Sequence, residues 1–298
     1  MYPAIRIVKQ VLCVACGLST IMNSANAENF IGLGQPGSPG TVSLQFYPTL
    51  SHFSPNTNAA KVFSEVSYTT KGGFSSESRD RFEFWVGGYA GYQSPHTNSG
   101  GGGWGGASPE LGVEYYYQGI APKQGAPFGT PDYREWWISP TLALDFPNGS
   151  AKSSGFGAGA NQYTLSASVN NFVGIGRFNM SINPVQLIYA TRNINATEVE
   201  AGRSERLRGG LTIGLMDTAF GYQVSDSLIA GLHHAYYIYS ASASDFKRST
   251  EGIIGPTLTY LGLASHGIYI SATLDFDYHV SGTPRTTALN AMIVKEFD

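Results

Sequence analysis

A long alternation of polar and apolar residues, from Gly267 to Val280, constrains the fold of this chain more than any other feature. Successive side chains of a β-strand point to opposite faces. A soluble strand usually runs for about 5–6 residues, whereas a strand that crosses a bilayer obliquely needs about 9–11. The segment therefore predicts a membrane-spanning strand. Its lipid face would carry Ile268, Ile270, Ala272, Leu274, Phe276 and Tyr278, and its inner face Tyr269, Ser271, Thr273, Asp275, Asp277 and His279.

Similar alternation recurs along the chain, which predicts an all-β fold: a transmembrane antiparallel β-barrel of about 12 strands. Bacterial single-chain barrels have an even strand number, so ten and fourteen strands stay open as alternatives. The predicted strands are Thr41–Leu50, Lys61–Thr70, Arg79–Gln93, Glu110–Gln118, Trp136–Phe146, Asn161–Asn170, Arg177–Thr191, Gly209–Val224, Ser227–Ser240, Glu251–Leu263, Gly267–Val280 and Thr286–Phe297.

The strand pattern has three irregular places. The alternation slips at Asn183-Pro184, which predicts a bulge because proline cannot donate to a strand ladder, and it changes phase again near Asp217. The connection Gly119–Glu135 is long although its order in the chain assigns it to the periplasmic side, where turns are short. Either this turn is extended or the strand count differs by two.

The first 27 residues predict a secretory signal peptide that is cleaved from the mature protein. Arg6 and Lys9 precede an apolar run, Val11–Met22, and Ala25-Asn26-Ala27 is a small-x-small cleavage site. A lipoprotein acylated at Cys16 is the alternative. Residues 28–40 would form a periplasmic lead-in and residues 41–298 the barrel.

Composition agrees with an outer-membrane barrel. The chain has 37 glycines and 13% aromatic residues but only 13% charged residues, about half the globular average. Both cysteines precede residue 28, and no run of 18 apolar residues exists to form a membrane helix. Without Arg6 and Lys9, 16 basic and 21 acidic residues remain, a negative balance that does not attract nucleic acid. We therefore expect the outer membrane of a Gram-negative bacterium, reached through the periplasm, with membrane lipid and lipopolysaccharide as neighbours.

Several short motifs resemble a known family. These are the P-G-x-P-G-T entry to the first strand, the G-x-x-G-P-x-L-x-Y run at Gly252–Tyr260 and a final strand that ends in Phe297. They resemble the outer-membrane barrel family linked to the meta-pathway of phenol degradation. The resemblance implies a barrel that passes aromatic or other hydrophobic small molecules, and it implies no catalytic residues. The chain departs from the usual barrel ending because Asp298 follows Phe297.

Polar and aromatic residues on the inner phase of the predicted strands form the candidate site. The carboxylates predict an acidic constriction that disfavours anions, or else a set of charges that pairs with Arg81 and Arg177 and fills the lumen. The aromatic residues predict a stacking path for aromatic solutes, or lumen packing. The candidates are Tyr47, Glu65, Arg81, Glu83, Trp85, Glu114, Tyr116, Trp137, Asp145, Tyr269, Asp275 and Asp277.

Two other constellations are less favoured. Asp275, Asp277 and His279 share one face, but groups two residues apart on a strand lie about 6.6–6.8 Å apart, which is wide for one metal ion. His52 and Ser54 have the spacing of a lipid-acting hydrolase, with no identifiable third group. We expect no catalytic residues, cofactor or metal, and His233-His234 is predicted to be packing.

The sequence thus favours a channel for passive passage of small, hydrophobic or aromatic solutes. The alternatives are a surface structural or adhesion barrel that acts through its outer loops, and a lipid-acting esterase. The solute, the openness of the lumen and the oligomeric state stay open.

Overall fold

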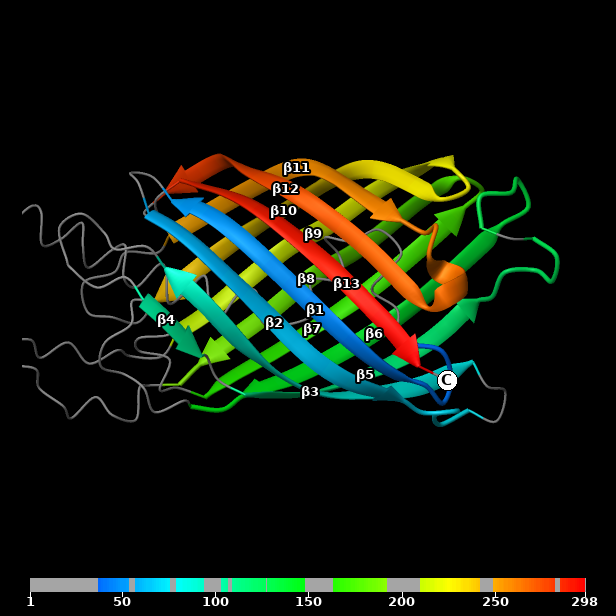
Figure 1. Cartoon of the computed structure of the whole chain (residues 1–298), viewed down its shortest axis with the longest axis horizontal. Coiled ribbons are helices and arrows are strands. Elements are labelled where there is room, and N and C mark those ends of the chain that lie inside the picture. The colour runs from blue at the N-terminus through cyan, green and yellow to red at the C-terminus, as the bar shows by residue number, and fades with distance from the viewer. Residues whose placement is uncertain are drawn as a thin grey trace, which may run out of the picture.

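The computed structural model describes residues 37–53, 57–75, 79–93, 103–106, 109–126, 128–147, 163–191, 210–241, 249–281 and 285–297. These residues form a single antiparallel β-barrel (Figure 1). Its strands are β1 Val42–Phe53, β2 Thr57–Thr69, β3 Asp80–Gln93, β4 Gly103–Gly106, β5 Glu110–Ile120, β6 Arg134–Asp145, β7 Thr164–Ile175, β8 Phe178–Ala190, β9 Gly210–Ser225, β10 Leu228–Ala241, β11 Ser249–Tyr260, β12 Ile268–Ser281 and β13 Thr286–Phe297.

Twelve of these strands close the barrel, which confirms the predicted fold and strand number. Each strand pairs with its neighbours in chain order, and the sheet closes where β1 pairs with β13, from Val42 opposite Phe297 to Phe53 opposite Thr286. The short strand β4 pairs only with the end of β3 and lies outside the closed ring. Closure leaves no sheet edge, which is the condition for strands to cross a membrane.

The two faces of the wall differ as the alternation requires. Serine, threonine and acidic side chains on one face are buried, while large apolar side chains on the other face are exposed. The exposed face is the outer surface of the barrel, and only lipid can cover so wide an apolar band. Its residues include Phe46, Leu50, Val66, Phe84, Val86, Leu111, Leu142, Leu165, Phe220, Leu232, Leu258 and Ile293.

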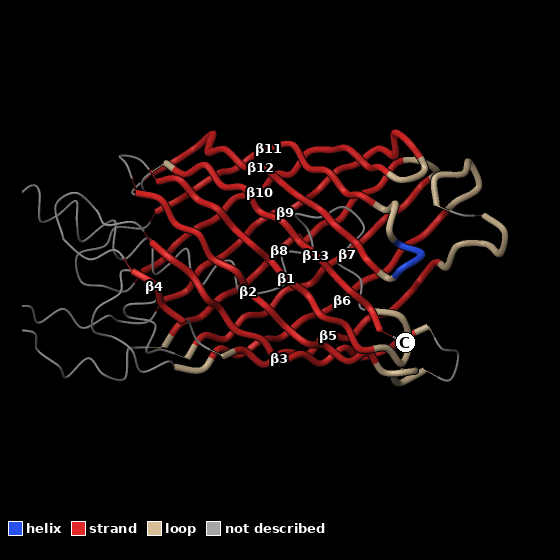
Figure 2. The backbone as a smooth tube through the Cα atoms, in the orientation of Figure 1, coloured by secondary structure: helices blue, strands red, loops and turns tan. Residues whose placement is uncertain are grey.

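Short connections gather at one end of the barrel (Figure 2). Gly176 and Arg177 join β7 to β8, and Asp226 and Ser227 join β9 to β10. Gly176 has φ of 60°, a left-handed conformation that glycine adopts without strain. Short turns mark the periplasmic end of an outer-membrane barrel. The chain segment 1–36, which includes the predicted signal peptide and most of the lead-in, lies outside the described residues.

The connection between β5 and β6, residues 121–133, lies at the same end and is long. The strand count is twelve, so this turn is extended and the alternative of a different count is wrong. Of the helices described, none is long and apolar enough to cross a membrane.

Register shifts occur in the β7–β8, β9–β10 and β11–β12 pairings. The first two correspond to the predicted irregularities, and the third lies in the Gly267–Val280 alternation. The predicted slip at Asn183-Pro184 lies opposite a shift between Ser168 and Asn171 in the β7–β8 pairing. The predicted phase change near Asp217 coincides with Met216, whose φ is 52°, and with a shift in the β9–β10 pairing.

The third shift, in the β11–β12 pairing, has no counterpart in the sequence pattern. Gly252 pairs with His279 and Ile253 with Asp277, so that Tyr278 is the extra residue. The alternation from Gly267 to Val280 therefore breaks near its end. His279 is exposed and stacks on Tyr236 with ring centroids 5.8 Å apart, instead of sharing the inner face with Asp275 and Asp277. The predicted common face of these three residues is wrong for His279.

We predict that Gly255→Ala destabilises the barrel by about 1–3 kcal/mol, because overpacking a tight contact costs this much. A Cβ atom at Gly255 would lie 1.8 Å from the Leu274 carbonyl oxygen, so the backbone of β11 or β12 must move. The measurement is urea unfolding in detergent, followed by the change in gel migration between folded and heated protein. Gly72→Ala is the matched control because no atom lies within 4 Å of the place that its Cβ would take, and equal stability of both variants would contradict the prediction.

Candidate functional site

The inner wall formed by β2, β3, β5 and β6 is rich in carboxylates. Glu83 on β3 lies directly opposite Glu114 on β5, and Glu110 lies opposite Asp145 on β6. Glu65 on β2 faces the same space. All five side chains are buried. The fold thus brings together carboxyl groups that are far apart in the sequence and concentrates them on one side of the lumen.

Neutral donors hold several of these carboxylates in place. The Gln45 Nε2 atom donates to Glu83 Oε1 at 3.2 Å, and the Gly37 backbone N–H donates to Glu83 Oε2 at 3.1 Å. The Ser139 hydroxyl donates to Glu114. The indole of Trp85 donates to Glu110 Oε1 at 2.8 Å. Such bonds fix the positions of the oxygens without cancelling their charge.

Basic side chains on the inner face of the described strands are few. The Arg81 guanidinium lies 4.0 Å from the centre of the Tyr116 ring, which is a cation–π contact. Lys61 on β2 has a buried ammonium nitrogen. Arg177, predicted to oppose the acids, instead occupies the exposed turn after β7 and does not line the lumen. The inner wall that the structure describes therefore has more acidic than basic side chains.

Aromatic side chains form a cluster toward the short-turn end of the lumen. Trp137 stacks on Phe172 with centroids 5.6 Å apart and lies 5.5 Å from Tyr116. Phe128, from the long β5–β6 connection, packs against this cluster. Phe128 also packs against the buried pair Ala219 on β9 and Ile229 on β10. One side chain of the connection thus packs against inward clusters on β5–β7 and on β9–β10, so the connection folds over part of the periplasmic mouth.

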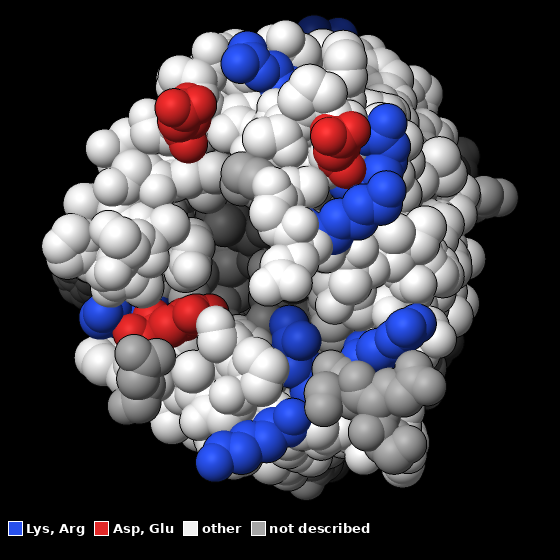
Figure 3. Space-filling view, turned by 90° about the vertical axis from the view of Figure 1, so that its right-hand side faces the viewer, with Lys and Arg blue, Asp and Glu red and all other residues white. Residues whose placement is uncertain are grey.

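The end of the barrel with short turns is hollowed at its centre, and basic and acidic side chains are spread around its rim (Figure 3). The extended connection gives this mouth an aromatic boundary through Phe128 and Tyr133, whose rings lie 5.1 Å apart. This position explains why the chain has a long segment where a short turn would join the strands.

A histidine clamp crosses the opposite wall of the lumen. His233 on β10 is fully buried; its Nε2 atom lies 2.9 Å from Asp217 Oδ1 and its Nδ1 atom 2.6 Å from Asp275 Oδ1. Carboxylates accept hydrogen bonds, and both ring nitrogens donate in the imidazolium form. Tyr237 donates to Asp217 at 2.9 Å and Asn290 donates to Asp275 at 3.0 Å. The clamp links β9, β10, β12 and β13 beside two of the register shifts.

Two buried asparagines next to the clamp have no hydrogen-bond partner for their side-chain atoms among the described residues. Asn170 on β7 and Asn183 on β8 are each 1% exposed. Asn183 lies directly opposite Asp217, and Asn170 lies opposite Ser139. Leaving a buried amide without a partner costs about 1–3 kcal/mol. These four residues extend the polar lining from the histidine clamp toward Glu114.

Of the twelve predicted lumen residues, eight are buried, and Tyr47, Arg81, Tyr269 and Asp277 are half-buried. Tyr47 donates to Gln45 Oε1 at 2.7 Å and, with Tyr269, packs against Met292 and Val294. Asp277 accepts from the backbone N–H of Thr286, whereas Asp275 belongs to the clamp. Asp275 and Asp277 therefore have different hydrogen-bond partners, although they lie two residues apart on β12. Their contact with a passing solute stays a prediction.

Sequence reasoning missed several inner residues. The two faces of the Ser227–Ser240 segment look equally mixed because Ile229 and Ala235 point inward beside polar residues. The prediction of mere packing for His233 follows from that mixture, although the phase of the neighbouring strands points it toward Asp217. Buried inner residues outside the candidate set include Gln45, Glu110, Asn170, Asn183, Asp217, His233 and Glu251.

Of the hydrolase pair only His52 lies among the described residues, and Asn58 supplies a third group that orients its ring. The His52 Nδ1 atom lies 2.8 Å from Asn58 Oδ1, and Ser54 lies outside the described residues. Within those residues, no group of three or more His, Cys, Asp or Glu side chains is placed to hold a metal ion. Most residues of the outer loops, on which the adhesion alternative depends, are also outside the described part of the chain.

No protein-family model and no curated protein sequence matches this chain. Among solved structures, an outer-membrane channel from Pseudomonas putida F1 is similar, with a TM-score of 0.69 and 14% identity over 89% of this chain and 98% of that one. The translocator domain of the autotransporter NalP from Neisseria meningitidis gives 0.46 and 10% identity, over 95% of this chain and 96% of that one. The outer-membrane protein OprD from Pseudomonas aeruginosa gives 0.38 and 6%, over 90% and 97%. The chain has the fold of outer-membrane β-barrels.

Proposed function

We propose that this protein is an outer-membrane channel for passive passage of small molecules, with a preference for neutral or cationic solutes and, among these, for hydrophobic or aromatic ones. The observation that carries the proposal is the excess of carboxylates on the buried inner wall, against Lys61 and Arg81 as basic neighbours. Rings of carboxylates favour cations and repel anions in other channels. The similarity in fold to the Pseudomonas putida F1 channel supports a channel in the general sense.

The aromatic cluster supports the finer part of the proposal. Tyr116, Trp137 and Phe172 form this cluster near the periplasmic mouth and are at most 2% exposed, so a solute must displace the groups that cover the rings to pack against them. Aromatic rings gain about 0.5–1.5 kcal/mol from each well-placed ring partner beyond simple burial. Hydrophobic and aromatic solutes would therefore reside longer at this cluster than aliphatic polar solutes of equal size.

The first test is the ion preference of the purified full chain in a planar bilayer, measured as the reversal potential in a salt gradient. We expect cations to pass more readily than anions. The double variant Glu83→Gln and Glu114→Gln should shift the reversal potential toward no preference, because it removes two facing carboxylates. Asp132→Asn, on the exposed periplasmic connection, is the control. Absence of conductance, or a preference for anions, would refute the proposal.

A second prediction concerns the periplasmic mouth. Phe128→Ala should raise the single-channel conductance and the uptake of small solutes into liposomes, because it removes the side chain that packs against both inward clusters at the mouth. Phe74→Ala is the matched control, since Phe74 is 83% exposed in another connection at this end and packs against Phe82 and Tyr115. Unchanged conductance in Phe128→Ala would show that the connection does not narrow the path.

A third prediction concerns the unpartnered amides. Asn170→Leu and Asn183→Leu should leave stability unchanged or raise it, because they remove buried polar groups without partners. They should slow the uptake of solutes that carry hydroxyl or amide groups more than the uptake of solutes without such groups. Asn290→Leu should instead lower stability, because Asn290 donates to Asp275. Paired unfolding and liposome-uptake measurements check all three variants; equal slowing of every solute would contradict a direct role for the amides.

A further inference from the structure

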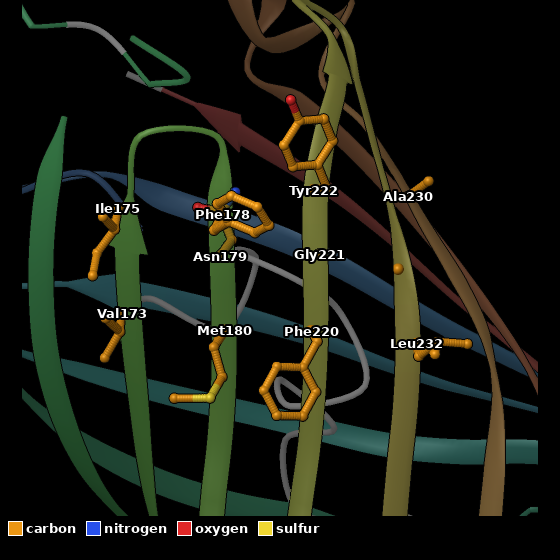
Figure 4. Close-up of a pocket in the computed structure, with 11 residues that line it drawn as sticks. Val173, Ile175, Phe178, Asn179, Met180, Phe220, Gly221, Tyr222, Ala230 and Leu232 are labelled. Atoms are coloured by element: carbon orange, nitrogen blue, oxygen red, sulfur yellow. The ribbon is translucent and has the colours of Figure 1, made fainter. Parts of the chain in front are cut away.

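An apolar groove lies on the outer, lipid-facing surface of the barrel near its short-turn end (Figure 4). It encloses about 560 Å³ and crosses four neighbouring strands, β7 to β10. Two rows of outward side chains border it. The pairing places the first row as Val173, Met180, Phe220 and Leu232, and the second row as Ile175, Phe178, Tyr222 and Ala230.

The floor of the groove is backbone. Asn179, Gly221 and Gly231 pair side by side between the two rows; the asparagine side chain points inward, and the glycines have none. The rows are two residues apart, about 6.6–6.8 Å along the strands. Large side chains stand on both borders: Phe178 is 66% exposed and Phe220 is 53% exposed. The result is a narrow furrow rather than a round pocket.

The position of the groove limits what fills it. It lies within the apolar band of the wall, where lipid is the surrounding medium, and its borders expose no charged side chain. An apolar groove gains no hydrophobic free energy from lipid tails, since these are as apolar as the groove itself. An occupant is therefore held by close packing and by polar contacts made at the end of the groove.

Polar groups of both signs occupy the nearby turns. Arg177 and Asp226 are exposed in the β7–β8 and β9–β10 turns, and the backbone N–H of Gln223 donates to the Arg177 carbonyl oxygen at 2.9 Å, which holds these two strand ends together. The Tyr222 hydroxyl points toward the same end of the barrel in Figure 4. A guanidinium matches a phosphate, a carboxylate matches an ammonium group, and interfacial tyrosines lie at headgroup level.

We propose that this groove binds one acyl chain of a zwitterionic glycerophospholipid of the periplasmic leaflet, with the phosphate at Arg177 and the ammonium group at Asp226. The short-turn end faces the periplasm, so the neighbouring leaflet contains glycerophospholipid, not lipopolysaccharide. The site lies outside the lumen and requires only that the barrel spans the membrane. Its failure would leave the proposed channel activity untouched.

The test measures lipid retention by native mass spectrometry of the full chain, released from nanodiscs that contain phosphatidylethanolamine and phosphatidylglycerol in equal amounts. Ala230→Phe fills the groove, and Ala167→Phe is its control on the outward face of β7 outside the groove. Arg177→Gln removes the phosphate contact, and Lys123→Gln is its control in the exposed β5–β6 connection. Heat-modifiable gel migration establishes that each variant is folded.

We expect the unaltered protein to retain one phosphatidylethanolamine molecule that Ala230→Phe loses and Ala167→Phe keeps. Arg177→Gln should retain it several-fold less than Lys123→Gln. Equal retention in Ala230→Phe and Ala167→Phe, or stronger retention of phosphatidylglycerol, would overturn the proposal. A dimer that only Ala230→Phe abolishes would also overturn it, because the groove would then bind a second copy of the chain.

Discussion

The pairing of every backbone polar group across a closed sheet is the constraint on which this structure depends. A strand inside a bilayer has no water to satisfy its N–H and C=O groups, so each must bond to a neighbouring strand. The β1–β13 and β2–β3 pairings complete the ring. Closure then fixes the rest: one face of every strand meets lipid, and the other encloses a space that its own side chains must fill or line.

The polar side chains of the inner face are arranged differently on the two sides of the barrel. Between β2 and β6, carboxylates such as Glu83 and Glu114 lie opposite each other and are held by neutral donors. Between β9 and β13, two aspartates share His233, whose imidazolium form offsets part of their charge. The carboxylates between β2 and β6 are suited to interact with charged solutes. The histidine clamp instead links β9, β10, β12 and β13 near the register shifts of the β9–β10 and β11–β12 pairings. The same residue types thus serve different purposes on the two sides of one barrel.

The strands could be predicted from the sequence because the alternation is a local property of the chain. Each predicted segment coincides with a strand to within a few residues, and the bulges near Pro184 and Asp217 left visible breaks in the pattern. The extra residue at Tyr278 left none, because a tyrosine followed by a histidine continues a polar–apolar alternation equally well. The phase changes there because Gly252 pairs with His279 and Ile253 with Asp277, and this register depends on the neighbouring strand β11.

The site was less accessible to sequence reasoning for a related reason. That Glu83 and Glu114 have inner phase follows from their own strands, but that His233 lies between Asp217 and Asp275 depends on the register of three strands at once. The role of the β5–β6 connection was likewise hidden, because Phe128 packs against the cluster of Ala219 and Ile229, which is distant in the chain. The outer groove depends on four strands lying side by side and has no signature in any one of them.

The seam between β1 and β13 also bears on how the protein is made. The first strand, β1, cannot complete its pairing until the last strand, β13, is in place, since Val42 pairs with Phe297. Joining two such remote ends carries a large entropic penalty, and such distant contacts form late. Until the ring closes, any partly formed sheet therefore has two unpaired edges, which must be shielded from other chains.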